Sequence, residues 1–158
     1  MKVGKAVLAG VIGAIAMTIL GWLVRQMGID MNAEMMLGTM LARPESGAWI
    51  IGFAMHLMIG VFFALIYAWG FERLTHRAGV VVGLGFAVVH IIFAGVMMAV
   101  IPAVHPMIPE MMMPPGAFMS GMGAMGVTLF VLEHLMYGAI VGGMYGAVQH
   151  PVPPPVTV

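Results

Sequence analysis

The chain has 158 residues; 62% of them are hydrophobic, 8% are charged, and the formal net charge is zero. A water-soluble domain carries charges on about a quarter of its residues, so this composition excludes a protein that water surrounds on all sides. Lipid must solvate most of the molecule. The chain has no cysteine, which excludes disulfides, thiolate catalysis and thiolate metal sites. No run of basic residues indicates nucleic-acid binding.

Four apolar segments are each long enough to cross a bilayer as an α-helix. We expect these helices over residues 6–25, 48–71, 79–101 and 121–148. At about 1.5 Å of rise per residue each one spans the hydrocarbon core, where open strands cannot satisfy their backbone polar groups. The sequence therefore predicts an all-α fold. We expect the chain to be a polytopic membrane protein, with a four-transmembrane-helix bundle that forms a single domain over residues 1–148.

The basic residues predict the orientation of this bundle. One side carries both termini and four basic residues: Lys2, Lys5, Arg73 and Arg77. The opposite side carries only Arg25 and Arg43. Because cytoplasmic loops are enriched in lysine and arginine, we expect a multi-pass protein of the bacterial inner membrane with both termini in the cytoplasm.

Three segments outside the helices have distinct compositions. Residues 32–42 begin with a capping residue, Asn32, and are mostly apolar, which predicts a short helix lying on the membrane surface. Residues 102–116 form an outer loop with five prolines and four methionines, and proline prevents a continuous helix there. Residues 149–158 form a proline-rich tail that we expect to be extended or disordered.

The second and fourth expected helices resemble each other. Residues 56–60 read His-Leu-Met-Ile-Gly and residues 134–138 read His-Leu-Met-Tyr-Gly, at an offset of 78 residues. This predicts a duplicated helical hairpin whose two copies are related by an axis along the membrane normal. Chance similarity between apolar helices is the alternative. Glycines spaced by four residues, such as Gly138 and Gly142, predict closely packed helices or a tight oligomer contact.

Four ionisable groups lie inside the expected helices: His56, His90, Glu133 and His134. A charge in the hydrocarbon core costs about 2.5–3.5 kcal/mol, so these groups need partners. His56 and His134, with His90 as a third candidate, could bind the iron of haem b or a copper ion. The alternative is neutral histidines that hydrogen-bond between helices, with a protonated Glu133 bonded to His90 or Thr18.

The same buried polar groups suggest a proton-transfer hypothesis. Glu133 could carry a proton, and three hydroxyl groups also lie within the expected helices: Thr18, Tyr67 and Tyr145. So few polar groups would be a poor path for a hydrated solute.

The second outer loop suggests a copper hypothesis, because methionine thioethers suit Cu(I). The candidate ligands are His105, Met107, Met111, Met112 and Met113. Beyond them, Met119, Met122 and Met125 recur at every third position. Methionine also fills hydrophobic space without any metal, and this is the alternative for the twenty methionines of the chain.

Several stretches together carry a family resemblance. They are the glycine-rich first helix, residues 27–32, the Gly52-x3-His56-x3-Gly60 pattern, and residues 134–146, which are the most specific. In these stretches the chain resembles a family of small, uncharacterised bacterial membrane proteins with four predicted helices, a domain of unknown function. The resemblance covers nearly the whole chain and implies the four-helix fold, without implying an activity. The Met- and Pro-rich loop and the proline tail depart from that pattern.

We do not expect an enzyme, because the sequence has no nucleophile–base–acid set, phosphate loop or metal-hydrolase motif. We interpret the chain as an accessory, structural or assembly subunit that packs against other membrane proteins or copies of itself, within a respiratory or metal-dependent complex. Its apolar surface, small residues and adaptable methionines agree with this interpretation. The alternatives are a haem- or copper-binding membrane protein and a proton- or ion-transfer protein.

Overall fold

A computed structural model describes residues 1–148, so the predicted tail at residues 149–158 lies outside the described residues. The four long helices are α1 (Val3–Gln26), α3 (Ala48–Gly70), α4 (Val80–Val100) and α5 (Gly123–Tyr145). Each one is long and apolar enough to cross a membrane, and the described part of the chain contains no strand. The prediction of an all-α protein with four such helices is confirmed.

Short elements connect the long helices. They are α2 (Ala33–Gly38), η1 (Pro44–Ser46), the short π-helix η2 (Phe71–Thr75), η3 (Ile101–Ala103) and η4 (Ala117–Met122). Gly79 precedes α4 with a φ of 137°, a conformation that L side chains rarely adopt. Pro102, which lacks a backbone N–H, follows the last residue of α4 by two positions and prevents its continuation.

Helix α2 lies within residues 32–42, where the sequence predicts a short helix on the membrane surface. In the structure this helix packs against the rest of the protein. Asn32 caps α2, because its Oδ1 accepts a hydrogen bond from the Met35 N–H at 3.0 Å. Glu34 and Gly38 are buried. A Cβ at Gly38 would overlap the carbonyl group of Ala48, so the α2 and α3 backbones are in direct contact. This contact carries Glu34 into the interior.

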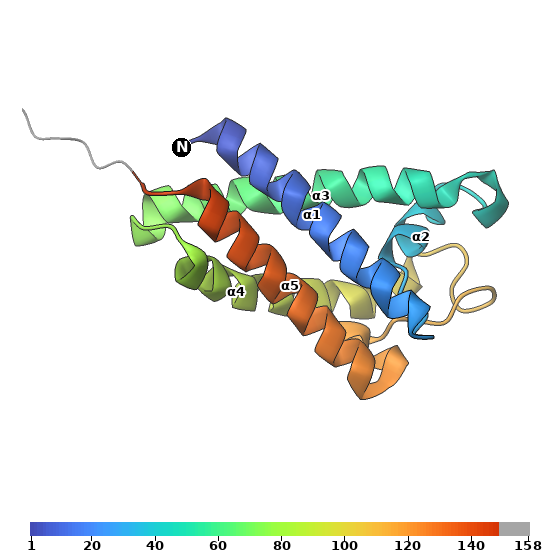
Figure 1. Ribbon diagram of the computed structural model, residues 1–158. Helices are drawn as coiled ribbons and strands as arrows, with labels where there is room; N and C mark the ends of the chain where they lie inside the picture. The colour runs from blue at the N-terminus through green and yellow to red at the C-terminus, as the bar shows by residue number, and fades with distance from the viewer. Residues whose placement is uncertain (149–158) are drawn as a thin grey trace, which may run out of the picture.

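In space the long helices follow the order α3, α1, α5, α4 (Figure 1). α1 packs closely on both α3 and α5, and α5 packs closely on α4. The start of α1, the end of α5 and η2 lie at one end of the bundle, which we call the terminal end (Figure 1). α2 and residues 101–122 lie at the other end, which we call the α2 end.

The two helical hairpins share the same glycine contact. In the α1–α3 pair, a Cβ at Gly60 would lie 2.8 Å from the Ala14 Cβ. In the α4–α5 pair, a Cβ at Gly138 would lie 2.6 Å from the Ala87 Cβ. Gly60 and Gly138 are equivalent in the sequence repeat, so the two pairs pack in the same way. This geometry supports the predicted duplicated hairpin.

The duplication is not symmetric where the two hairpins meet. A two-fold axis relating α1 to α4 and α3 to α5 would make the α1–α5 contact equivalent to an α3–α4 contact. The Tyr137 ring fills the α1–α5 contact, 2.6 Å from where a Cβ of Gly13 would stand. The repeat has Ile59 at the position of Tyr137, and the backbones of α3 and α4 stay apart. Because α3 and α4 do not make this contact, a cavity remains between them.

Gly60→Ala and Gly138→Ala are expected to destabilise the protein by similar amounts, about 1–3 kcal/mol each. Each new methyl group would overlap an alanine across an equivalent helix pair. Gly85→Ala is the matched control, because a Cβ at that position has nothing within 4 Å. Unfolding by SDS in mixed micelles, followed by circular dichroism, measures all three variants. A large cost at only one repeat position would contradict the equivalence of the hairpins.

Candidate functional site

The space between α3 and α4 is a cavity of 620 Å³. α1 and α5 form its back wall, and α2 and residues 101–104 border it at the α2 end. Most of the lining side chains are apolar. Ionisable groups from all five α-helices stand on the wall: Arg25, Glu34, His56, His90, Glu133 and His134.

The cavity opens sideways between α3 and α4. Large apolar side chains of both helices line it and are also exposed on the outside: Met58, Phe62, Phe93, Met97 and Val100. Toward the terminal end, aromatic side chains close the gap, with the Phe63 ring stacked on the His90 ring at a centroid distance of 3.8 Å. Both α3 and α4 are apolar enough to cross a membrane, and in a bilayer an opening between two such helices would face lipid chains.

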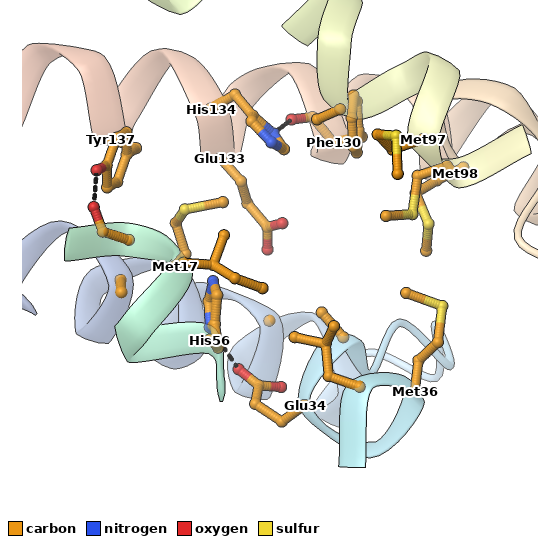
Figure 2. Close-up of a pocket in the computed structure, with 18 of the residues that line it drawn as sticks. Met17, Glu34, Met36, His56, Met97, Met98, Phe130, Glu133, His134 and Tyr137 are labelled. Atoms are coloured by element: carbon orange, nitrogen blue, oxygen red, sulfur yellow. Dashed lines mark hydrogen bonds and ion pairs between the residues drawn. The ribbon is translucent and has the colours of Figure 1, made fainter. Parts of the chain in front are cut away.

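Glu34 is buried at the α2 end of the cavity, with 2% of its surface exposed. Its Oε1 lies 3.5 Å from His56 Nδ1 (Figure 2). Its Oε2 lies 3.8 Å from Arg25 Nη1. Thr18 Oγ1 lies 3.2 Å from the same nitrogen of His56. Arg25 also donates a hydrogen bond to the Met31 carbonyl at 2.8 Å. The buried carboxylate therefore has both a cationic partner and hydrogen-bond donors.

This environment keeps Glu34 ionised. Burial raises the pKa of the Glu34 carboxyl, but hydrogen bonds from His56 and Thr18 lower it by more, so its pKa lies below the ordinary value of 4.5. A carboxylate only accepts hydrogen bonds, so His56 donates to it through Nδ1. A neutral His56 then keeps a lone pair on Nε2, which has no hydrogen-bond partner among the described residues.

Glu133 of α5 is buried as well, with 6% of its surface exposed, but it lacks a partner. No residue within 1–148 forms a hydrogen bond or ion pair with it, and its carboxylate points into the cavity between His56 and His134 (Figure 2). The predicted hydrogen bond from Glu133 to His90 or Thr18 is wrong. Thr18 bonds to His56 on α3, and His90 bonds to a tyrosine of that helix. No side-chain oxygen or nitrogen of the described residues is both fully buried and without a hydrogen-bond partner, so the Glu133 oxygens are accessible from the cavity.

The other two predicted histidines lie side by side on the cavity wall, with ring centroids 4.9 Å apart. His134 Nδ1 is 2.8 Å from the Phe130 carbonyl oxygen. Because that oxygen only accepts, Nδ1 carries the proton, and a neutral His134 keeps a lone pair on Nε2. His90 Nδ1 lies 3.4 Å from the Tyr67 hydroxyl. His56 and His134 thus retain the same ring nitrogen as an acceptor.

These histidines do not form a complete metal site by themselves. Within the part of the chain that the structure describes, no three His, Asp or Glu side chains gather closely enough to hold a metal ion. Two imidazoles suffice as axial ligands of a haem iron, and within residues 1–148 Nε2 of His56 and Nε2 of His134 have no hydrogen-bond partner. Haem b or copper at His56 and His134, with His90 as third candidate, stays a prediction.

His105 lies apart from the cavity histidines and links α2 to the methionine-rich loop. Its Nδ1 accepts a hydrogen bond from the Met107 N–H at 3.1 Å, so Nε2 carries the proton. Nε2 donates to the Met36 carbonyl at 2.9 Å and lies 3.2 Å from Thr39 Oγ1. Both ring nitrogens are therefore occupied in this arrangement. Copper binding at His105, Met107 and Met111–Met113 stays a prediction, although this histidine offers no free lone pair.

The two tyrosines of the proton-transfer hypothesis lie in different places. Tyr67 reaches the cavity wall through His90. Tyr145 lies at the terminal end, where its hydroxyl donates to Glu72 Oε1 at 2.6 Å and accepts from the Lys2 N–H at 2.9 Å. Tyr145 therefore connects the N-terminus to η2 and does not reach Glu133. Proton transfer through Glu133 stays a prediction.

Three polar residues of the cavity were not predicted from the sequence: Arg25, Glu34 and Tyr137. Glu34 and Arg25 belong to a connecting segment and a helix end, where charged residues are ordinary. The sequence feature that could have indicated the position of Glu34 was the glycine pair Gly38 and Gly52, because their small size lets α2 contact α3. Tyr137 differs from its repeat equivalent, but that difference alone does not indicate a cavity.

Comparison with known proteins identifies a family that matches the chain. A family model described as a family of unknown function (DUF6789) matches residues 1–155. No curated protein and no solved structure matches the chain. The family match spans almost the whole sequence, and it confirms the resemblance drawn from the glycine and histidine patterns.

Proposed function

We propose a function for this chain, which belongs to the DUF6789 family of unknown function: it binds a lipid-soluble molecule in the cavity between α3 and α4. The observation that carries the proposal is Glu133, a largely buried acid that forms no hydrogen bond or ion pair within residues 1–148 and whose carboxylate is accessible from an apolar cavity (Figure 2). Such a group is costly unless another polar group meets it. The described residues supply no such group, so a ligand would.

The size and opening of the cavity support a small lipid-soluble ligand. Its volume of 620 Å³ falls within the range of about 300–1,000 Å³ that is usual for small-molecule sites. An apolar lining with a few converging polar groups is also typical of such sites. Because the opening lies between two membrane-type helices, the ligand would enter from the bilayer, and its apolar part would lie between Phe62 and Phe93.

The polar wall favours a ligand that donates hydrogen bonds. Nε2 of His56 and Nε2 of His134 are both acceptors, and Glu133 accepts in either protonation state. A hydroxyl group, as in a long-chain alcohol or quinol, would donate a hydrogen bond to one of these acceptors, and an amine could donate to more than one. A ligand with only ether oxygens would leave these acceptors unpaired, which costs affinity.

A matched pair of probes tests this proposal. We expect purified protein in detergent to bind a long-chain alkylphenol about tenfold or more tightly than its methyl ether, because only the phenol donates a hydrogen bond. Titration calorimetry measures both affinities. Glu133→Leu should weaken phenol binding and remove most of the preference. Glu110→Gln, which alters an exposed acid outside the cavity, should change neither. Equal affinity of the wild-type protein for the two probes would contradict the proposal.

One observation favours a second function, the accessory role expected from the sequence. The rim of the opening carries exposed aromatic and methionine side chains, including Phe62 and Phe93. A transmembrane helix of another protein could occupy the gap, since helices associate in lipid through such packing. A photoreactive residue at position 62, activated in cells, separates the two functions. A small-molecule adduct supports the ligand, whereas a protein adduct supports the accessory role.

Location in the bacterial inner membrane, with both termini in the cytoplasm, belongs to the same proposal. It is supported by the basic residues Lys2, Lys5, Arg73 and Arg77 at the terminal end and by the rule that cytoplasmic loops are rich in such residues. The α2 end would then face away from the cytoplasm.

A further inference from the structure

A second, smaller pocket of 210 Å³ lies at the α2 end. Eleven residues line it, and seven of them are methionines: Met35, Met36, the three at positions 111–113, Met119 and Met122. They come from three separate segments, namely α2, the proline-rich loop and η4. The fold thus gathers thioether groups that are more than eighty residues apart in the sequence. Asp30 is the ionisable residue of the lining.

Hydrophobic packing accounts poorly for the outer part of this pocket. Met119 at its base is buried and belongs to a core cluster. Met111 and Met113, by contrast, are 71% and 61% exposed, in a loop outside the membrane-type helices. A methionine with most of its surface exposed fills no core. Between them, Met112 is held by a hydrogen bond from the Thr39 hydroxyl to its sulfur at 3.2 Å.

The ligand chemistry of the pocket selects a soft ion. Thioether sulfur prefers Cu(I), whereas zinc and harder ions prefer imidazole, thiolate or carboxylate sets. Nowhere in residues 1–148 do three His, Asp or Glu side chains gather to form such a set. Thioethers are neutral, so a bound ion keeps its charge, and the Asp30 carboxylate is placed to balance it.

We propose that this pocket binds one Cu(I) ion through methionine thioethers from α2, the loop at positions 111–113 and η4. His105 is not a ligand, because both of its ring nitrogens already form hydrogen bonds, and neither His105 nor Met107 lines the pocket. His105 instead holds α2 against the loop and so brings the thioethers together. This site does not depend on the lipid-soluble ligand proposed for the larger cavity.

Competition with a Cu(I) chelator tests the proposal. The full-length protein in detergent, kept under a reductant without oxygen, is titrated with Cu(I) in the presence of bicinchoninate. We expect a single Cu(I) per chain. The Met111→Leu/Met113→Leu variant should bind at least about tenfold more weakly, since loss of a ligand exceeds the effect of losing an outer partner. Leucine keeps the apolar volume and removes the sulfur, and both positions are exposed, so the fold should persist.

The control is Met27→Leu/Met125→Leu, which removes two exposed methionines that line neither this pocket nor the larger cavity. It should bind Cu(I) like the wild-type protein. X-ray absorption of the loaded protein should show a first coordination shell that is rich in sulfur. In the copper-loaded His105→Asn variant, the number of nitrogen ligands in that shell should be the same as in the wild-type protein. An equal loss of affinity in both double variants, or a first shell dominated by nitrogen, would overturn the proposal.

Discussion

Glu34→Ala is expected to destabilise the folded protein by about 3–5 kcal/mol, because removing one partner of a buried ion pair leaves the other charge uncompensated. In the wild-type protein Arg25 Nη1 and His56 Nδ1 lie 3.8 Å and 3.5 Å from the Glu34 carboxylate. Unfolding by SDS in mixed micelles measures the loss. Glu45→Ala is the matched control, since Glu45 is exposed in η1 and should cost little. Equal stability of the two variants would contradict the buried pair.

Acid should remove part of the same stabilisation. Burial raises the pKa of Glu34, but the hydrogen bonds from His56 and Thr18 bring its pKa below the ordinary 4.5. A carboxyl with a lower pKa in the folded state stabilises the fold above its unfolded pKa, and this contribution disappears as the pH falls through the folded pKa. The stability difference between wild-type and Glu34→Gln should therefore be constant near neutrality and shrink below pH 4.5. A constant difference down to about pH 3 would contradict this ionisation.

The four long helices could be predicted because their signal is local. Each is an apolar segment of sufficient length, and lipid leaves such a segment few alternatives to a helix. The duplicated hairpin was also visible, since His56 and Gly60 recur as His134 and Gly138. The opening between α3 and α4 was not. A helix in lipid is apolar on every side, so composition does not show which face meets a neighbour and which meets lipid.

Part of the candidate site could be predicted, because some of its residues also give a local signal in the sequence. His56, His90 and His134 stand out because an ionisable group is costly within an apolar helix. Glu34 gave no comparable signal, because an acid in a connecting segment is ordinary unless its helix is known to pack inward. Its contact with His56 depends on the approach of α2 to α3, which no local pattern specifies. The lack of a partner for Glu133 likewise appears only when its neighbours are placed.

The Gly52→Ala variant tests this dependence of the site on the α2–α3 contact. A Cβ at Gly52 would overlap the carbonyl group of Glu34, which is backbone and cannot turn aside. We expect a loss of about 3 kcal/mol or more, at the upper end for overpacking. Because α2 must move outward, the Glu34 carboxylate should leave His56 and Arg25. Unfolding in SDS micelles measures the loss, with Gly85→Ala as the control that adds the same methyl group in open space.

A double-mutant cycle separates this coupling from simple crowding. If Gly52→Ala already withdraws Glu34 from its partners, then adding Glu34→Gln should cost much less in the Gly52→Ala background than in the wild-type protein. Crowding that left the ion pair in place would instead give additive losses. Additive losses would mean that α2 holds its position by other contacts and that Glu34 reaches His56 independently of the glycine pair. A strong interaction term would identify Gly38 and Gly52 as the residues that place an acid from a connecting segment on the cavity wall.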